Sequence, residues 1–259
     1  MSISGRQYEN RLKTALGAGA ATVGGWVCSG SPAMAEAMAT LGFDWIAVDM
    51  EHTATGLTAA EAIFVICERY DIAPLVRLPE ADPIFARRLL DIGAHGFIVP
   101  QVEDAAALQD FAAHLVYPPA GKRGVCLSRM NAWGDDFADY HKGFSPVIAP
   151  QIESARGIAN VAEIAGLDCV DAVFLGPYDL SADLGCAGDF TAQSFLAACE
   201  TYREACSATG KAMGIHQVDP DIDALNGRLQ EGYRFIAYGT DTVAARKALG
   251  GLRDIGTRR

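Results

Sequence analysis

Residues 45–52 read WIAVDMEH, and this stretch decides the fold. Its first four residues are all apolar, so an extended strand here would be apolar on both faces. Strands of this kind are typical of parallel sheets that helices cover on both sides. The run then ends in ionisable side chains, at Asp49, Glu51 and His52. The stretch therefore predicts a buried parallel strand with polar groups at its carboxyl end.

Seven further runs of β-branched and apolar residues share this character, and alanine-rich amphipathic stretches separate them. Two of these stretches begin with a capping residue before proline, Ser31-Pro32 and Asp82-Pro83, which is a typical helix start. The further strands are expected at Thr22–Val27, Ala73–Leu78, Gly96–Val99, Val147–Ile152, Ala172–Leu175, Lys211–Ile215 and Phe235–Tyr238. Helices are expected at Pro32–Thr40, Thr58–Tyr70, Pro83–Ile92 and Phe190–Thr209. Eight strands alternating with helices in 259 residues predict one α/β domain, residues 1–259, folded as a (β/α)8 TIM barrel.

The main alternative is a doubly wound open sheet that binds a dinucleotide. Its fingerprint would be a G-x-G-x-x-G turn after the first strand. Residues 24–30 read GGWVCSG and lack that spacing, which favours the barrel. One stretch, residues 117–145, breaks the alternation between the fourth helix and the fifth strand. Because it is rich in aromatic residues, we expect an ordered excursion, over the barrel mouth or into a subunit contact.

The composition excludes several classes of protein and partner. Half of the residues are hydrophobic, which is enough for one large core. The formal net charge is −11 and no run of Lys or Arg follows the chain, so we expect no nucleic-acid partner. The seven cysteines form no C-x-x-C pair, no signal peptide is visible, and no apolar run reaches ~18 residues. These features predict a cytoplasmic protein with reduced thiols and no membrane contact.

Ionisable and amide side chains recur where the predicted strands end. In a (β/α)8 barrel these ends meet at one mouth, where active sites lie. Glu153 follows the fifth strand and Asp179 the sixth, and two carboxylates from adjacent strand ends can bind a hard divalent cation. We therefore predict a site for Mg²⁺ or Mn²⁺, with Co²⁺ and other divalent ions as alternatives. The competing interpretation is that each carboxylate caps the helix that follows it.

Two further side chains are candidates for proton transfer and charge stabilisation. His52 is the candidate base, with Asp49 placed to fix its tautomer, and His216 after the seventh strand ranks second. Arg77 ends an otherwise apolar strand and can clamp a carboxylate or a developing oxyanion. The alternative for Arg77 is a buried structural pair with Asp49 or Glu51. No lysine stands at the carboxyl end of a predicted strand, which disfavours imine chemistry.

Five motifs, taken in order, resemble the HpcH/HpaI aldolase family of metal-dependent pyruvate aldolases. The motifs are WIAVDMEH (45–52), VRLP (76–79), GKRGV (121–125), QIES (151–154) and GPYDLS (176–181). The resemblance runs from the first predicted strand to the eighth. It implies a barrel whose C-terminal helix is exchanged between subunits, and Asp241–Leu252 is the candidate for that helix. It also implies a homo-oligomer, a hexamer built as a trimer of dimers.

The resemblance implies roles for single residues as well. Glu153 and Asp179 would ligate the divalent metal, Arg77 would stabilise the enolate oxygen, and His52, held by Asp49, would transfer protons. Contacts to the substrate would come from Gln151, Gly176, Pro177 and the backbone amide of Tyr178. The implied activity is that of a class II aldolase, a carbon–carbon lyase that joins pyruvate, or a hydroxypyruvate-like 2-oxo acid, to an aldehyde.

Two other functions remain open. A coenzyme A thioester lyase on the same barrel would need a basic surface for the phosphates of its substrate, and no such cluster is evident. A non-catalytic protein that binds a metal and a 2-oxo acid would lack the proton transfer assigned to His52. Exchange of the methyl protons of pyruvate with solvent distinguishes catalysis from binding.

Overall fold

The predicted strands form, and each pairs in parallel with its neighbours in the sequence. The last strand pairs with the first, so the sheet closes into a (β/α)8 barrel. The computed structural model describes residues 8–250. The strands are β1 (Thr22–Val27), β2 (Trp45–Asp49), β3 (Ala73–Arg77), β4 (Gly96–Val99), β5 (Val147–Ile152), β6 (Ala172–Leu175), β7 (Ala212–Gln217) and β8 (Phe235–Thr240). The barrel is confirmed, and the open-sheet alternative is wrong because β1 is bonded to both β2 and β8.

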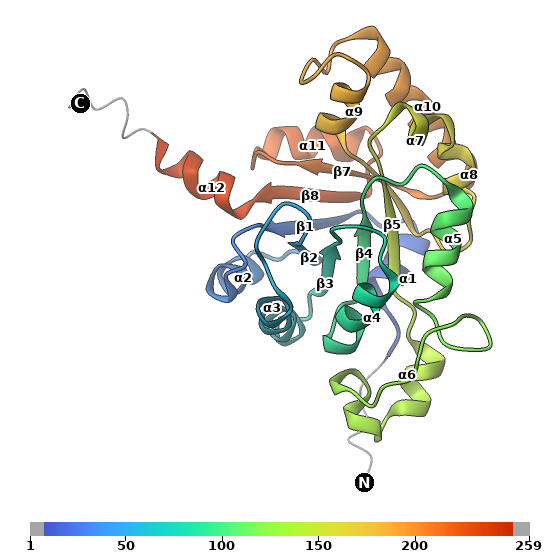
Figure 1. Ribbon diagram of the computed structural model, residues 1–259. Coiled ribbons are helices and arrows are strands. Elements are labelled where there is room, and N and C mark those ends of the chain that lie inside the picture. Colours follow the sequence, from blue (N-terminus) through green and yellow to red (C-terminus); the bar gives the residue numbers. More distant parts are fainter. Residues whose placement is uncertain (1–7, 251–259) are drawn as a thin grey trace.

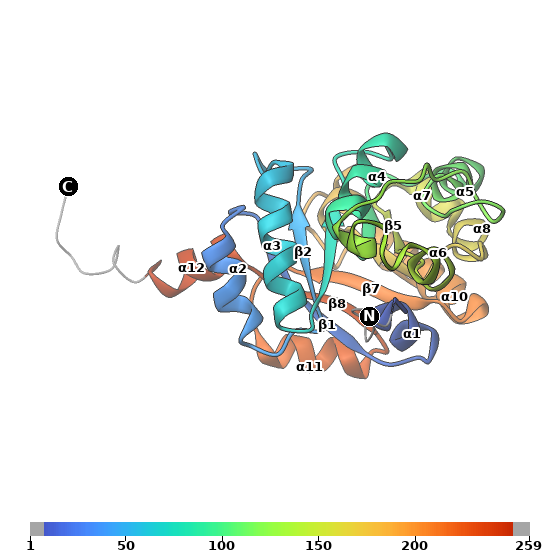
Figure 2. The ribbon, with the colours of Figure 1, turned by 90° about the horizontal axis from the view of Figure 1, so that it is seen from below.

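Helices surround the barrel, as Figures 1 and 2 show. They are α1 (Arg11–Gly17), α2 (Pro32–Ala39), α3 (Leu57–Arg69), α4 (Pro83–Ile92), α5 (Ala105–Ala113), η1 (Arg129–Gly134), α6 (Phe137–Gly143), α7 (Ala155–Ala159), α8 (Val161–Ala165), α9 (Pro177–Asp183), α10 (Gln193–Thr209), α11 (Ile222–Gln230) and α12 (Asp241–Ala248). The two predicted caps are present: the side chain of Ser31 accepts a hydrogen bond from the amide of Met34, and that of Asp82 from the amide of Ile84. In the described part of the chain, no helix is both long and apolar enough to cross a membrane.

Two apolar layers hold the barrel together. Large and small side chains fill its interior, among them Trp45, Phe174, Phe235 and several alanines, and a larger layer packs between the strands and the helices. The glycine pair near the start of β1 serves this packing. A Cβ on Gly24 would lie 2.0 Å from the ring of Trp45, so only glycine leaves room for the indole inside the barrel.

Residues 117–145 form an ordered excursion with its own small apolar cluster of Tyr117, Met130 and Tyr140. Arg129 donates a hydrogen bond to the carbonyl of Ile92, at the end of α4, and Met130 lines a cavity next to the start of β3. These contacts place η1 and α6 at the N-terminal end of the barrel, in the lower part of Figure 1. The expected position over the catalytic mouth is therefore wrong, and the expected subunit contact stays a prediction.

Helix α12 follows β8 directly and points away from the barrel (Figure 1). It begins at Asp241, whose carboxylate accepts hydrogen bonds from the amides of Cys28 and Ser29 in the loop after β1. The helix is thus anchored at its first residue. The predicted helix reached Leu252, and residues 251–259 lie outside the described part of the chain. Its exchange between subunits stays a prediction.

Candidate active site

The polar ends of β2, β4, β5 and β6 open onto one cavity of about 420 Å³. This is the carboxyl end of the strands, where active sites of such barrels lie. The cavity is lined by Glu51, His52, Gln101, Glu103, Glu153, Asp179, Ala182 and Asp183. Among the predicted site residues, the structure thus brings His52, Glu153 and Asp179 together around one space.

Arg77 lies beside this cavity in a buried ion-pair network. Residues 49 and 77 are direct partners in the parallel β2–β3 register, which places their side chains together. The Nε of Arg77 donates to Oδ1 of Asp49 over 3.1 Å, and its Nη2 donates to Oδ2 of the same carboxylate. Its Nη1 lies 3.3 Å from Oε2 of Glu51. The pairing considered from the sequence is present with both carboxylates, and it holds the guanidinium at the mouth.

Burial and charge act in opposite directions on these two carboxyls. Burial opposes ionisation of Asp49, but the hydrogen bonds and charge of Arg77 outweigh it and lower the pKa of the Asp49 carboxyl. For Glu51, burial dominates and raises the pKa above its ordinary value in spite of Arg77. Oε2 of Glu51 is buried and accepts no hydrogen bond. The network therefore keeps one carboxylate ionised and leaves Oε2 of the other without a hydrogen bond, between the side chains of Arg77 and His52.

The imidazole of His52 reaches into the open part of the site, with 64% of the side chain exposed. Its Nε2 lies 3.5 Å from Oε2 of Glu51. Asp49 accepts hydrogen bonds from the backbone amides of Glu51 and His52 and therefore fixes the loop rather than the ring. The expectation that Asp49 orients the imidazole is not met, because the carboxylate of Asp49 is directed at Arg77 and Glu51 is the acidic neighbour of the ring.

Glu153 is held in place from three directions. Its Oε1 accepts a hydrogen bond from the backbone amide of Gln101 over 2.7 Å, and its Oε2 accepts one from Nε2 of Gln151 over 2.5 Å. Gly176 lies against the same carboxylate, since a Cβ there would come within 2.7 Å of Oε2. Gln101 has φ near +52°, a strained conformation that turns its amide toward Glu153.

The alternative that the two candidate ligands are helix caps is excluded for these helices. Ser154 caps α7, with its side chain accepting from the amide of Gly157. Gly176 is the N-cap of α9, and Asp179 lies within the first turn of that helix without acting as its cap. Pro177 has no amide hydrogen, and the amide of Tyr178 lies in the first turn, where helices offer no carbonyl partner. The side chain of Tyr178 packs edge-on against Phe190.

The donor set of the cavity fits a hard divalent cation. Burial raises the pKa of the Glu153 carboxyl to about 7, and the charges of Glu51 and Asp179 act in the same direction. A bound cation would relieve this crowding of negative charge. Gln151 leaves its Oε1 buried without a hydrogen-bond partner, next to Glu153. Within residues 8–250, no group of three or more His, Cys, Asp or Glu side chains is arranged to hold a metal, so substrate oxygens and water would complete the coordination.

His216, the second candidate base, is removed from the reaction space. Its ring stacks on Trp26 with centroids 4.2 Å apart, and its Nε2 lies 3.1 Å from Oγ1 of Thr240. Burial, assisted by the charge of Arg77, lowers the pKa of His216 to about 3. The guanidinium of Arg77 also lies over the ring of Trp26, with its Cζ 5.0 Å from the ring centroid. His216 therefore packs against the tryptophan that contacts Arg77.

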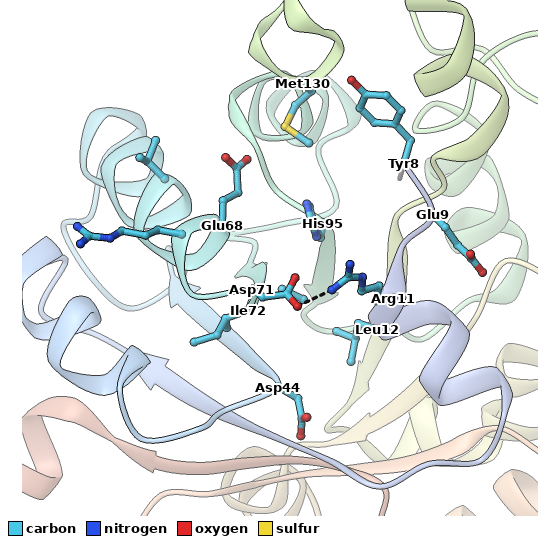
Figure 3. Close-up of a pocket in the computed structure, with 13 residues that line it drawn as sticks. Tyr8, Glu9, Arg11, Leu12, Asp44, Glu68, Asp71, Ile72, His95 and Met130 are labelled. Atoms are coloured by element: carbon cyan, nitrogen blue, oxygen red, sulfur yellow. Dashed lines mark hydrogen bonds and ion pairs between the residues drawn. The ribbon is translucent and has the colours of Figure 1, made fainter. Parts of the chain in front are cut away.

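A second cavity, of about 580 Å³, lies at the opposite end of the barrel (Figure 3). Its lining includes Asp44 before β2, Ala73 at the start of β3 and His95 before β4. Arg11 of α1 forms an ion pair there with Asp71. In such barrels this end serves stability rather than catalysis.

Five lining residues were not predicted as site residues: Glu51, Gln101, Glu103, Ala182 and Asp183. Glu51 and Gln101 stand at strand ends, so the rule that located Glu153 could have found them. Glu103 lies in the loop after β4, and Asp183 lies at the end of α9. Nothing local in the sequence distinguishes those two from surface carboxylates.

The closed barrel and its carboxylate-lined mouth define the class of protein, a (β/α)8 enzyme with its site at the carboxyl ends of the strands. The chain belongs to the HpcH/HpaI aldolase/citrate lyase family, whose model matches residues 22–248. It is accordingly a class II aldolase, a carbon–carbon lyase.

Individual relatives agree with this assignment. A protein of Enterobacter sp. (strain 638) named 5-keto-4-deoxy-D-glucarate aldolase is 35% identical over 251 residues, which cover 95% of this chain and 96% of the relative. An HpcH/HpaI aldolase/citrate lyase family protein from Burkholderia cenocepacia J2315 is 31% identical with a TM-score of 0.85, covering 94% and 99% of the two chains. An HpcH/HpaI aldolase from Desulfitobacterium hafniense DCB-2 is 27% identical with a TM-score of 0.86, covering 96% and 97%.

Proposed function

We propose that this chain catalyses the reversible aldol reaction between pyruvate, or a hydroxypyruvate-like 2-oxo acid, and an aldehyde, with Mg²⁺ or Mn²⁺ as cofactor. The observation that carries the proposal is the juxtaposition of Glu153 and Asp179 in one cavity, beside the guanidinium of Arg77. The relative from Enterobacter supports it, because the six-carbon oxo diacid in its name yields pyruvate when the bond next to its methylene group is cleaved.

The cation would be held by Glu153 and Asp179, and when bound it supplies Lewis-acid polarisation of the oxo group. Gln101 and Gln151 hold the Glu153 carboxylate in a fixed orientation. Helix α9 begins directly after β6, and its first-turn amides, including that of Tyr178, would receive the carboxylate of the oxo acid. Gly176 and Pro177 would also contact the substrate, and Gly176 lies against the carboxylate of Glu153, where a Cβ would come within 2.7 Å of Oε2.

Proton transfer is assigned to His52. The imidazole is exposed to the cavity and has Glu51 as its acidic neighbour, so it can exchange a proton with the substrate at its carbon or aldehyde oxygen. Arg77 presents its positive charge from a position fixed by Asp49, where it would stabilise an oxyanion as it develops. The homo-oligomer with an exchanged C-terminal helix belongs to the same proposal and rests on the family resemblance. The cytoplasmic setting is proposed from the cysteine pattern.

The test follows the exchange of pyruvate methyl protons in D₂O by NMR, with Mn²⁺ or Mg²⁺ and with a chelator. We expect metal-dependent exchange in the wild type. Glu153→Ala should lose both exchange and Mn²⁺ retention, whereas His52→Ala should keep Mn²⁺ and lose roughly 10²–10⁴-fold in exchange rate. Glu163→Ala, on the exposed side of α8, is the matched control and should change neither. Absence of exchange at saturating Mn²⁺ would leave a binding protein, and full Mn²⁺ retention by Glu153→Ala would overturn the ligand assignment.

A further inference from the structure

We propose that the acceptor aldehyde of this enzyme is an uncharged, hydroxylated aldehyde, and that Glu103 and Asp183 select for it. The inference rests on the proposed function and concerns the part of the same cavity that the oxo acid would leave free. It departs from the 5-keto-4-deoxy-D-glucarate named for the relatives, whose cleavage next to the methylene group would yield an aldehyde that carries a carboxylate.

The lining of the cavity is one-sided in charge. Five of its eight residues are carboxylic acids, and in the described part of the chain His52 is the one lining residue that can carry a positive charge. The guanidinium of Arg77, beside the cavity, is already bonded to Asp49 and faces Glu51. Apart from His52, to which proton transfer is assigned, no lining side chain in the described part of the chain can form an ion pair with a second carboxylate of the substrate.

Glu103 and Asp183 are fixed at the wall of the cavity by the start of α7. Oε1 of Glu103 accepts a hydrogen bond from the hydroxyl of Ser154 over 2.6 Å. Oδ2 of Asp183 accepts one from the amide of Ala155 over 2.7 Å. Arg156 lies 3.6 Å from the other oxygen of Glu103, but its side chain is 66% exposed and is not part of the lining. Each of the two carboxylates is thus hydrogen-bonded to the start of α7 and turned toward the cavity that both residues line.

Charge and hydrogen-bonding capacity then favour the same kind of acceptor. An ionised carboxylate is an acceptor-only group, so Glu103 and Asp183 can receive hydrogen bonds from substrate hydroxyls and not from another carboxylate. Even with a divalent cation between Glu153 and Asp179, and with Arg156 counted, the surroundings of the acceptor stay negative. One like charge within several ångströms at the effective dielectric of a protein surface lowers binding by roughly tenfold or more.

The reaction itself needs no further reactant. One methyl proton of pyruvate is removed, the resulting carbon forms a bond to the aldehyde carbon, and the aldehyde oxygen takes up a proton. No electron is gained or lost overall. The product is a 4-hydroxy-2-oxo acid, with additional hydroxyls wherever the acceptor carries them.

The test compares two aldehydes that differ only at one end. Glyceraldehyde and tartronate semialdehyde have the same three carbons and the same central hydroxyl, but the second carries a carboxylate where the first has a hydroxymethyl group. With saturating pyruvate and Mn²⁺, we expect kcat/KM for glyceraldehyde to exceed that for tartronate semialdehyde by at least about tenfold. A preference for tartronate semialdehyde would overturn the inference.

Two variants locate the selectivity. Glu103→Gln and Asp183→Asn remove one charge each while keeping a hydrogen-bond acceptor, and each should raise the ratio of tartronate semialdehyde to glyceraldehyde turnover by roughly threefold to tenfold. Glu163→Gln on α8 should leave the ratio unchanged. Equal ratios in all three variants would overturn the assignment of the two residues.

Pyruvate proton exchange, measured in the same samples, distinguishes failure of this inference from failure of the proposed function. Exchange without a preference for the neutral aldehyde overturns only this inference. Absence of exchange overturns the proposed function on which it rests.

Discussion

At the scale of single residues, Gly176 occupies a position beside Glu153 where a side chain does not fit. A Cβ at this position would lie 2.7 Å from Oε2 of Glu153 and 2.9 Å from Nε2 of Gln151. Its φ is negative, so the conformation itself would tolerate alanine, and the limit is the space next to the carboxylate. The glycine thus leaves room for Glu153 to keep its orientation toward the cavity.

We expect Gly176→Ala to displace the Glu153 carboxylate while the barrel still folds. Mn²⁺ affinity and kcat should each fall roughly tenfold or more, since outer contacts of a metal ligand commonly have effects of this size. Titration calorimetry with Mn²⁺ and steady-state rates measure the two quantities. Gly227→Ala is the control, because a Cβ there meets nothing within 4 Å. Unchanged Mn²⁺ affinity in Gly176→Ala would contradict the role given to Gly176.

The contacts of Arg77 and His52 show which side-chain pairs can be predicted from the sequence and which cannot. The charge at the end of an apolar strand predicted a functional or paired arginine, and the register of β2 and β3 confirms the pair with Asp49. The sequence also predicted that Asp49 orients the imidazole of His52, and in the structure Glu51 is the acidic neighbour of that ring. Neighbouring carboxylates at the end of one strand cannot be distinguished from the sequence, because the tertiary direction of each side chain decides which one meets the imidazole.

At the scale of elements, Tyr202 joins α10 to the barrel wall. Its buried hydroxyl lies 2.8 Å from the carbonyl oxygen of Val173 in β6 and 3.0 Å from that of Gly214 in β7. The amide of Gly214 donates to the same hydroxyl over 2.8 Å. One buried hydroxyl therefore contacts backbone groups of two adjacent strands.

Tyr202→Phe should destabilise the protein by about 1–3 kcal/mol, because it removes these bonds and leaves buried backbone groups unsatisfied. Urea unfolding followed by circular dichroism measures the change, and the metal-loaded activity at low denaturant should stay close to that of the wild type. Tyr178→Phe is a matched substitution at an exposed tyrosine of α9. A loss of stability as large in Tyr178→Phe would contradict the explanation.

On the scale of the whole molecule, buried neutral histidines couple stability to pH. Burial lowers the pKa of His95 to about 4, below the ordinary value of about 6.5. Between these two values the unfolded chain binds a proton that the folded chain does not. Stability from this group is therefore complete above pH 6.5 and is lost as the pH falls toward 4.

We expect the free energy of unfolding to fall by about 2–3 kcal/mol from this residue between pH 7 and pH 4. His95→Gln should have a flatter profile over that window, whatever its stability at pH 7. Urea titrations at half-unit pH intervals give the slope. An equally steep decline in His95→Gln would show that other groups cause the acid sensitivity.

The amino-acid sequence by itself determined the alternation of strands and helices, the closed barrel class, and the polar residues Arg77, Glu153 and Asp179 at or just after the strand ends. These features are local, because strand periodicity and the polar residue that ends each strand are written in consecutive positions. The two carboxylates predicted a divalent cation, and the family resemblance added the reaction class.

Only the tertiary structure decided which groups meet. Closure of the barrel and the parallel register bring Asp49 and Glu51 to Arg77, and Glu103 and Asp183 to a common cavity wall. It also placed residues 117–145 at the end of the barrel away from the site. These outcomes depend on contacts between residues far apart in the chain, and no local pattern encodes the direction in which a loop folds or a side chain points.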